Sequence, residues 1–494
     1  MISITDKTRC CGCTACQAAC PHDAIVMKPD VLGFTYPEVD MSACVDCGLC
    51  EKVCAFVKDC DASLPVDRSL TAEVQAARHK DGNVVAASQS GGVFTALSDA
   101  VLSEGGVIYG AAYKGLDEVS HIRAESAQER NLLRGSKYVQ SDMGQIFRYV
   151  REDLVNGRKV LFSGTPCQVA GLKSYIPERL HENLLLVDFI CHGVPSPSVW
   201  KDYVEYMSRK GNIVRAIFRD KSVAGWKVHA DSFLYEDGKK RTGDTFRVLF
   251  YKNIILRHNC GNCPYNVTAH PADVTIGDFW GVEKVFPDMD DNKGISLVLV
   301  NSGKGRRFFA EFIKEADVKI RETKTKKCLQ RNLQIPTPRS KKTEDFWNDY
   351  LKCDYKKIVR KYGQVRIYER PDFSVLNCWQ KKLEKGEGLT YILGSRGVKK
   401  MLILGTKKNN QLAIMELKRG NIEVVGEVQF GNSEITKMVP KVALDNNLSE
   451  VAKDVDTILI TDESNMVDIL GALHKVNVPM EKITPLSFVV DEEV

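Results

Sequence analysis

CCGCTACQAACP (residues 10–21) and CVDCGLCEKVCA (residues 44–55) decide how the N-terminal part of this chain folds. Both stretches space four cysteines as C-x2-C-x2-C-x3-C. Three thiolates at this spacing can wrap one [4Fe-4S] cube, and the fourth cysteine of each run reaches across to the other cube. The spacing therefore predicts two clusters, one on Cys10, Cys13, Cys16 and Cys54, and the other on Cys44, Cys47, Cys50 and Cys20.

Zinc ribbons and disulfides are the alternatives for so many cysteines. Zinc sites usually pair two CxxC units across a longer gap, which this double pattern fits poorly. The first run also resembles the bacterial two-cluster ferredoxins, including its Cys20-Pro21 ending. The second run ends Cys54-Ala55, a departure that changes a turn preference and no ligand.

The bulk composition is that of an ordinary water-soluble globular protein. The chain has 494 residues, 44% hydrophobic and 27% charged, and its net charge of +5 is too dilute to indicate nucleic acid. No apolar stretch approaches the ~20 residues of a membrane span, and MISITDKTRC lacks a secretory core. Seventeen cysteines with ferredoxin spacing indicate reduced thiols, so we expect a cytoplasmic redox protein.

The chain is too long for one core, and we expect three domains of α/β or α+β class. Residues 1–60 form a ferredoxin-like domain, and the polar segment 59–70 is a linker. Residues 71–345 alternate apolar strands with amphipathic helices, as in an α/β domain. Residues 396–494 predict a small Rossmann-like module with strands at 399–406, 455–461 and 481–490 and a helix at 465–478. Its first turn, GTKKNNQ, lacks G-x-G-x-x-G, so interaction or regulation is a safer expectation than dinucleotide binding.

Two loops of the middle domain are candidates for cofactor binding. In SQSGGVFTAL (88–97) a glycine-rich turn opens a helix, whose free N–H groups suit a phosphate. A plain turn with an N-cap serine explains the same residues. LLRGSKYVQSD (132–142) carries Lys137 and many hydroxyls and amides, and composition does not separate a surface loop from a cofactor loop.

Four further cysteines follow predicted strands. Strands at 159–163, 184–190 and 272–277 precede Cys167, Cys191-His192 and Asp278, and a CxxC supplies Cys260 and Cys263. Ligands of open α/β sheets lie beyond the carboxyl ends of the strands, so these thiols can converge. A third iron–sulfur cluster, a zinc site using the CxxC with His258 or His270, and buried structural cysteines all stay open. We expect no catalytic Cys191-His192 pair, because sequence neighbours at a strand end need not face each other.

Isolated cysteines are expected to be structural: Cys11, Cys60, Cys328, Cys353 and Cys378.

Taken in order, the strand-end loops resemble one family. The motifs are SGGVFTAL (90–97), GSKYVQSD (135–142), FSGTPCQVAGLK (162–173), DFICHGVPS (188–196), CGNCPY (260–265) and ADVTIGDFWG (272–281). Together, behind the ferredoxin-like segment, they resemble the coenzyme F-420 hydrogenase/dehydrogenase beta-subunit family. The resemblance covers most of residues 1–345 and leaves out the C-terminal 150 residues.

This resemblance implies an iron–sulfur flavoprotein oxidoreductase. Family members use FAD to exchange two electrons with a hydride carrier and clusters to pass electrons singly. The resemblance places the FAD phosphates at Ser90, Gly91, Gly92 and Thr95, and the flavin at Lys137, Gln140, Ser141, Gly164, Thr165 and Pro166. It also places the family's own [4Fe-4S] cluster on Cys167, Cys191, Cys260 and Cys263.

The implied partners are ferredoxin or another redox protein and a small-molecule acceptor, either an organic substrate or a deazaflavin-like coenzyme. Two other functions stay open. One is a non-catalytic electron-transfer subunit of a larger oxidoreductase, and the other is a redox-responsive protein of a carbohydrate (polysaccharide) pathway, suggested only by the C-terminal module. The sequence indicates no catalytic side chain, nucleic-acid partner or membrane span.

Overall fold

The computed structural model describes residues 1–56, 73–363, 388–405, 407–418, 420–429, 446–461, 473, 478–479 and 482–486. The chain divides into two compact units, Met1–Lys221 with Asp231–Gly363 and Ser222–Ala230 with Gln364–Val494. Cys60, Cys378, the linker residues 59–70 and most of the helix expected at 465–478 lie outside the described residues.

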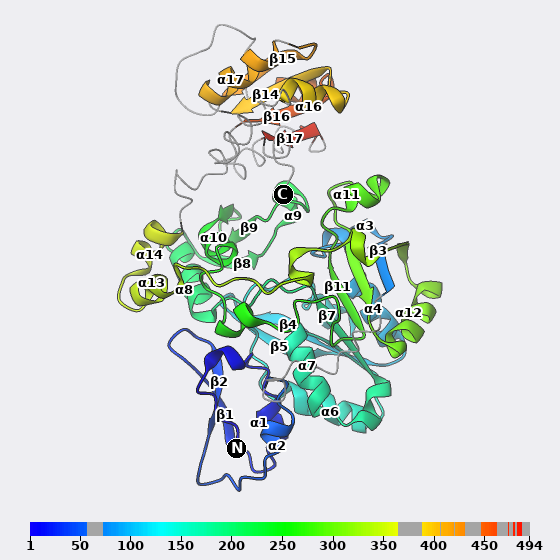
Figure 1. The fold of residues 1–494 in the computed structure, drawn as a ribbon, viewed down its shortest axis with the longest axis vertical. Helices are drawn as coiled ribbons and strands as arrows, with labels where there is room; N and C mark the ends of the chain where they lie inside the picture. The colour runs from blue at the N-terminus through cyan, green and yellow to red at the C-terminus, as the bar shows by residue number, and fades with distance from the viewer. Residues whose placement is uncertain are drawn as a thin grey trace. The chain divides into compact units, whose positions relative to one another are not determined.

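The N-terminal region of the first unit is built around its cysteine loops (Figure 1). It contains η1 (Lys7–Arg9), α1 (Ala15–Ala19), β1 (Ile25–Pro29), β2 (Thr35–Val39) and α2 (Leu49–Lys52), with β1 and β2 antiparallel. Both short helices start from a left-handed residue, Thr14 at φ 68° and Gly48 at φ 73°. The two cysteine runs therefore turn in the same way, as their matching spacing requires.

An eight-stranded sheet forms the body of the first unit, in the order β13-β3-β12-β11-β7-β6-β4-β5. Strands β4, β6, β7 and β11 are parallel neighbours, while β5, β12 and β13 run antiparallel to the strands they pair with. The strands are β3 (Glu73–His79), β4 (Val107–Lys114), β5 (Glu118–Ala124), β6 (Val160–Ser163), β7 (Leu184–Phe189), β11 (Val274–Asp278), β12 (Ser296–Val300) and β13 (Val318–Thr323). The strands expected at 159–163, 184–190 and 272–277 are confirmed as β6, β7 and β11, and the mixed α/β class is confirmed with them.

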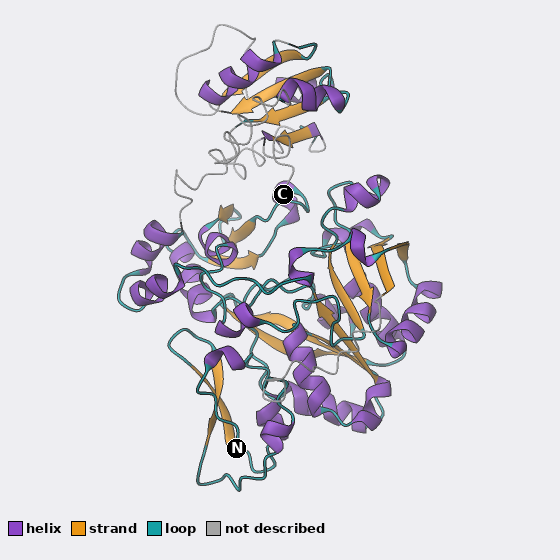
Figure 2. Ribbon diagram, viewed as in Figure 1, coloured by secondary structure: helices purple, strands orange, loops and turns teal. Residues whose placement is uncertain are grey.

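Helices cover both faces of this sheet (Figure 2). Because side chains alternate along a strand, Leu161 packs with the helices on one face while Val160 and Phe162 pack on the other. The first face is covered by α4 (Val93–Ser103) and α12 (Gly303–Glu315), and the second by α6 (Ile146–Val155) and α7 (Pro166–Tyr175). Ala15 of α1 belongs to the core of the second face, so the cysteine loops are seated on α6 and α7.

The remaining elements of the first unit flank the sheet. A three-stranded antiparallel sheet, β8 (Ile213–Ile217), β9 (Asp231–Tyr235) and β10 (Lys240–Gly243), shares one core with α8 (Pro197–Ser208), α10 (Thr245–Tyr251), α13 (Thr343–Tyr350) and α14 (Tyr355–Tyr362). Shorter helices are α3 (Gly82–Ala86), α5 (Ala127–Asn131), α11 (Val282–Val285) and the 3-10 helices η3 (Glu178–Asn183) and η4 (His258–Asn262), while α9 (Lys221–Ala224) falls mostly in the second unit.

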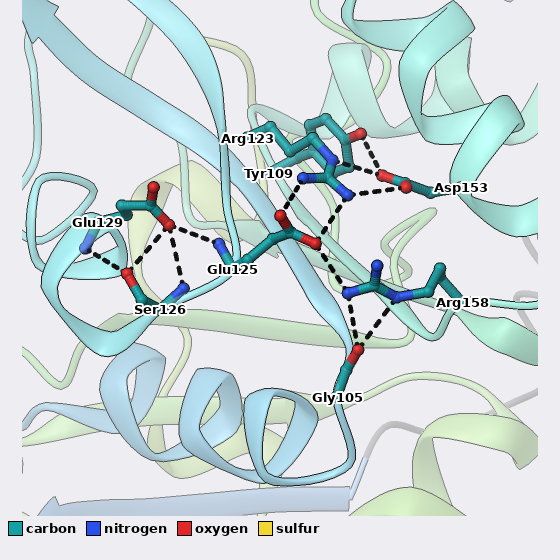
Figure 3. Close-up of polar contacts among 8 residues, drawn as sticks. All are labelled: Gly105, Tyr109, Arg123, Glu125, Ser126, Glu129, Asp153 and Arg158. Carbon is teal, nitrogen blue, oxygen red and sulfur yellow. Dashed lines mark hydrogen bonds and ion pairs between the residues drawn. The ribbon is translucent and has the colours of Figure 1, made fainter.

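A charged network secures the β4–β5 edge of the sheet (Figure 3). The Arg123 side chain donates to Asp153 Oδ2 at 2.8 Å, and the buried Tyr109 hydroxyl donates to the same oxygen at 2.6 Å. Glu125 accepts from Arg158 at 2.9 Å. The network joins β4, β5 and α6.

The second unit contains a four-stranded parallel sheet in the order β15-β14-β16-β17. Its elements are α16 (Leu389–Ser395), β14 (Lys400–Gly405), α17 (Lys407–Leu417), β15 (Glu423–Gln429), α18 (Asn446–Lys453), β16 (Thr457–Ile460) and β17 (Ile483–Pro485). The strands expected at 399–406 and 455–461 are confirmed as β14 and β16. Sequence analysis missed β15, and it took the residues of α17 for a turn because their polar lysines and asparagines mask the helix.

Candidate metal centre

Two cavities in the N-terminal region are lined by cysteines. One is lined by the first cysteine set, Cys10, Cys13, Cys16 and Cys54, with Cys11 beside it. The other is lined by the second cysteine set, Cys20, Cys44, Cys47 and Cys50. Each cavity takes three cysteines from one run and the fourth from the other run. The folded chain therefore brings together the same two groups of four that the spacing predicts.

The donor chemistry of both sets suits a multi-iron cube. Each cavity measures about 360 Å³, including space open to solvent, and its other lining residues are mostly apolar. Within the residues that the structure describes, no three His, Cys, Asp or Glu side chains are placed to share one metal ion. Burial raises the pKa of Cys16, so a thiolate there needs the compensating charge of iron.

The two sets differ in their surroundings. Cys47 of the second set is exposed, and the neighbouring Val45 and Leu49 are 62% and 40% exposed. The first set faces helix α7, where a Cβ added at Gly171 would lie 2.6 Å from the Cys13 sulfur. The second set thus lies towards solvent and the first set lies against the α/β sheet.

The strand-end cysteines, Cys167, Cys191, Cys260 and Cys263, gather beside the first set. Cys167 lies in the first turn of α7, Cys191 follows β7, and Cys260 and Cys263 lie in and after η4. Burial raises the pKa of Cys191, and the charges of the other three raise it further, which places all four within electrostatic range. The buried sulfur of Cys260 accepts the Val194 N–H at 3.4 Å, and Cys167 contacts the Thr165 hydroxyl at 3.2 Å.

Cys11, expected to be a structural cysteine, lies between these two groups. It is 7% exposed, and its sulfur lies 4.0 Å from the Cys167 carbonyl oxygen. Hydrogen bonds to Cys13 and then to Cys167 raise the pKa of its thiol well above the usual range, and burial adds to the effect. The same hydrogen bond from Cys11 lowers the pKa of Cys167 to about 7. Cys11 therefore joins a cysteine of the first set to a strand-end cysteine.

Arg257 makes a second connection between the cysteine loops and the sheet domain. Its guanidinium donates to the Cys10 carbonyl at 2.9 Å and to the Gln140 side-chain oxygen at 2.8 Å. The amide of Gln140 also lies against the loop at Gly12, where an added Cβ would be 2.7 Å from its nitrogen. Gln140, expected at the flavin, is thus placed beside the first cysteine set.

The expected phosphate residues lie at the start of α4. Ser90 donates to the Ile295 carbonyl at 2.7 Å, and the Gly91 N–H donates to Ser296 Oγ at 2.9 Å. Gly92 is the N-cap, at φ 86°, and supplies no side-chain cap. The buried Thr95 hydroxyl accepts from Arg134 at 3.1 Å. The helix therefore keeps an uncapped N-terminus with an arginine beside its first turn.

The expected flavin residues form two neighbouring groups. Lys137 donates to the carbonyls of Leu132 and Arg134 at 2.9 Å each, and burial lowers its pKa to about 7. Ser141 accepts from Gln168 at 3.1 Å, and Gln168 also closes the capping box of Thr165. Gly164 and Pro166 flank Thr165 in the β6–α7 turn. The structure thus brings Ser141 to the 164–166 turn and leaves Lys137 with the 132–134 segment.

His121 on β5 is a residue that sequence analysis missed. It is 6% exposed, contacts the Ser163 carbonyl through Nε2 at 3.0 Å, and stacks on Phe162. Burial lowers its pKa to about 4. His121 therefore lies neutral beside the 164–166 turn, and no motif marks it in the sequence.

Comparison with known families adds two matches. Residues 9–57 match the 4Fe-4S dicluster domain, and residues 157–326 match the family described as the C terminus of the beta subunit of coenzyme F420 hydrogenase/dehydrogenase. The chain therefore carries a domain of this beta-subunit family behind a dicluster domain. The resemblance noted in the sequence is confirmed. The chain is thus related to these beta subunits over residues 157–326 and to iron–sulfur dicluster domains over residues 9–57.

The individual relatives are distant. One subunit of the F(420)H(2) dehydrogenase of Methanosarcina mazei is 25% identical over 187 residues, which are 36% of this chain and 51% of the relative. The chain thus spans about half the length of that relative. An uncharacterized protein of Methanocaldococcus jannaschii is 23% identical over 372 residues, 69% of this chain and 96% of its own length.

A chain of the F420-reducing [NiFe] hydrogenase complex from Methanosarcina barkeri is 16% identical, with a TM-score of 0.38 over 64% of this chain and 96% of that chain. Among the described helices, none has the length and apolar character needed to cross a membrane.

Proposed function

We propose that this chain is an iron–sulfur, flavin-dependent oxidoreductase. It would pass electrons between its ferredoxin-type clusters and, through FAD, a hydride-accepting substrate or deazaflavin-like coenzyme. The observation that carries the proposal is the junction at Cys11, whose thiol lies between the first cysteine set and Cys167. A one-electron path from the dicluster domain into the sheet domain would cross at this point.

The order of the groups supports such a path. The second set, which has its exposed member at Cys47, would exchange single electrons with ferredoxin or another redox protein in the cytosol. The first set, seated on α7, would relay them to the strand-end cysteines. We propose that Cys167, Cys191, Cys260 and Cys263 hold a third [4Fe-4S] cluster, since their sulfurs are buried and share one electrostatic site.

The N-terminus of α4 would hold the phosphates of FAD, although the Ser90 hydroxyl and the Gly91 N–H already bond to Ile295 and Ser296. An uncapped helix N-terminus leaves backbone N–H groups and the positive end of the helix dipole for an anion, and Arg134 adds charge beside Thr95. FAD, when bound, supplies a carrier that takes two electrons together and releases them singly. The flavin ring would be positioned by Lys137, Gln140, Ser141 and the Gly164–Pro166 turn. His121 lies beside this turn in its neutral form, so it would place no positive charge next to the ring.

A non-catalytic electron-transfer role within a larger enzyme is the second candidate function. The observation that favours it is the similarity to a protein of the F(420)H(2) dehydrogenase, which is itself one subunit among others of that enzyme. On this alternative the chain would carry the same cofactors and would need a further protein for turnover.

Metal and flavin analysis of anaerobically purified protein tests the proposal. Three cubes predict about twelve irons per chain, and two predict about eight. A Cys260→Ser, Cys263→Ser variant should lose about four irons. The matched control is Cys328→Ser, since Cys328 is 3% exposed and, within the part of the chain that the structure describes, its thiol bonds to the nearby Thr325 carbonyl and to no cysteine. About eight irons in the wild type would refute the third cluster, and absence of bound flavin would refute the flavoprotein.

Turnover separates the two candidate functions. The isolated protein is supplied with reduced ferredoxin and a panel of hydride acceptors, and flavin absorbance is followed. Substrate reduction without other proteins supports the enzyme. Reduction of the bound cofactors without turnover of any acceptor supports the electron-transfer role.

A further inference from the structure

The guanidinium of Arg257 is buried, and none of its hydrogen-bond partners among the described residues is a carboxylate. The residue is 2% exposed. Its guanidinium donates to the carbonyls of Cys10 at 2.9 Å and Thr35 at 2.8 Å, and to the Gln140 amide oxygen at 2.8 Å. The rings of Tyr36 and Phe34 lie 4.3 and 5.4 Å from its central carbon. None of these partners carries a full negative charge.

The remaining partner is a cysteine sulfur of the first set. Nη2 of Arg257 lies 3.8 Å from Cys10 Sγ. A buried cation is costly unless an anion compensates it. Among the described residues, Cys10 Sγ is the sulfur that Arg257 contacts directly, and the thiols of Cys167 and Cys260 also lie within electrostatic range of its guanidinium.

We propose that Arg257 is a positioning residue that raises the reduction potential of the cluster held by the first cysteine set. The proposal rests on the proposed function only for the presence of that cluster. A cube with four thiolates is a dianion when oxidised, and one electron from a redox partner makes it a trianion without a proton. A fixed positive charge stabilises the trianion more than the dianion. Net charge and hydrogen bonds to sulfur are established determinants of cluster potentials.

The consequence is a direction for electron flow. Among the described residues, no guanidinium contacts a sulfur of the second set, although Arg148 donates to the Cys20 carbonyl at 3.1 Å and the Ile2 N–H donates to the Cys50 sulfur at 3.3 Å. Arg257 would therefore raise the potential of the first-set cluster relative to that of the second. A higher potential at the first set would favour electron transfer from the second set to the first set, which lies against α7. Arg257 precedes Cys260 by three residues, so the same short segment would hold the charge and a strand-end ligand.

Arg148 provides a matched control. It also ties the cysteine loops to the sheet domain, through the carbonyls of Gln17, Ala18 and Cys20 and an ion pair with Asp23. Its side chain is 32% exposed, and its hydrogen bonds to the described residues go to carbonyl oxygens and not to sulfur. An Arg148→Gln change therefore removes docking contacts without removing a charge from a sulfur atom.

Redox titration monitored by electron paramagnetic resonance tests the proposal on the anaerobic full-length protein, with dithionite as reductant. The signal of the first set is identified by its loss in a Cys16→Ala variant. Arg257→Gln should shift the midpoint of that signal to lower potential and leave the second-set signal unchanged. Arg257→Lys should shift the first-set midpoint less, because lysine keeps the positive charge but lacks the planar guanidinium with its several N–H donors. Arg148→Gln should shift neither midpoint.

Two outcomes would overturn the inference. One is an Arg257→Gln protein with full iron content and an unchanged first-set midpoint, and the other is an equal shift of every signal. A measurement on the unmutated protein covers the case in which Arg257→Gln loses iron. Pulsed resonance on reduced protein labelled with nitrogen-15 arginine should detect nitrogen coupled to the first-set signal, and its absence also refutes the contact. If no cluster signal is found in the wild type, the proposed function fails instead.

Discussion

Replacing Gly171 with alanine should displace iron from the first cysteine set while the protein stays folded. The added Cβ would lie 2.6 Å from the Cys13 sulfur and 3.1 Å from the Cys13 Cβ. Ordinary contacts are about 3.5–4.0 Å. One partner must therefore move by roughly 1 Å, whereas metal–ligand distances tolerate only about 0.2 Å. Cys13 is the residue expected to move, because Gly171 is fixed within helix α7.

Folding and metal binding should respond differently to this change. Overpacking costs about 1–3 kcal/mol, and replacing a helical glycine by alanine returns about 1 kcal/mol. The net loss of about 0–2 kcal/mol is small beside the roughly 5–15 kcal/mol that hold a native protein. Loss of iron in Gly171→Ala would therefore report a displaced ligand and not an unfolded chain.

The assay is iron and sulfide content with the visible spectrum, followed by thermal melting. We expect Gly171→Ala to lose up to about four irons per chain. Gly394→Ala is the control, because Gly394 lies in helix α16 with no atom within 4 Å of the added Cβ. It should keep all its iron and melt at the same or a higher temperature. A Gly171→Ala protein with full iron and an unchanged spectrum would refute the seating of the first set on α7.

Three further predictions concern the sheet domain. Asp153→Ala removes the hydrogen-bond acceptor of the buried Tyr109 hydroxyl and of Arg123. It should lower the free energy of unfolding by about 2–4 kcal/mol, measured by thermal or urea unfolding. Glu118→Ala on the same sheet edge is the control: this side chain is 60% exposed, so the change should be under about 1 kcal/mol. Burial lowers the pKa of His121 from 6.5 to about 4, so between these values the unfolded chain binds a proton that the folded chain does not. Wild-type stability should therefore fall as pH falls through that interval, and less steeply in His121→Gln; equal slopes would contradict the buried neutral imidazole. Gly91→Ala would place a Cβ 2.5 Å from the Ala77 carbonyl oxygen and 2.7 Å from the Ser296 nitrogen, so it should melt well below Gly82→Ala, whose Cβ meets no atom within 4 Å.

Some of the candidate site could be predicted because it is local in sequence. The spacing of Cys10, Cys13 and Cys16 alone indicates three ligands of one cube, since a short loop can only wrap so tight a group in a few ways. Apolar runs likewise indicated β6, β7 and β11, because strands buried on both faces are continuously hydrophobic. Because parallel strands end at the same edge of a sheet, the loops after β6 and β7, which carry Cys167 and Cys191, were expected to lie close together.

The contacts between these local groups came only with the tertiary structure. Arg257 and Cys10 are 247 residues apart, and Cys11 and Cys167 are 156 apart. No periodicity or spacing connects such pairs, because packing of α1 on α6 and α7 brings them together. Cys11 was expected to be structural, and no spacing in the sequence marks its contact with Cys167.

By itself the sequence predicted two sets of four cysteines and which run supplies each member, and each predicted set lines one cavity. Only the tertiary structure decided which set lies against the sheet domain and which lies towards solvent. Ligand spacing is a property of a few consecutive residues, whereas burial and charge around a cluster depend on every segment packed against it. The gap left by the missing side chain at Gly171 and the guanidinium of Arg257 distinguish the first set from the second.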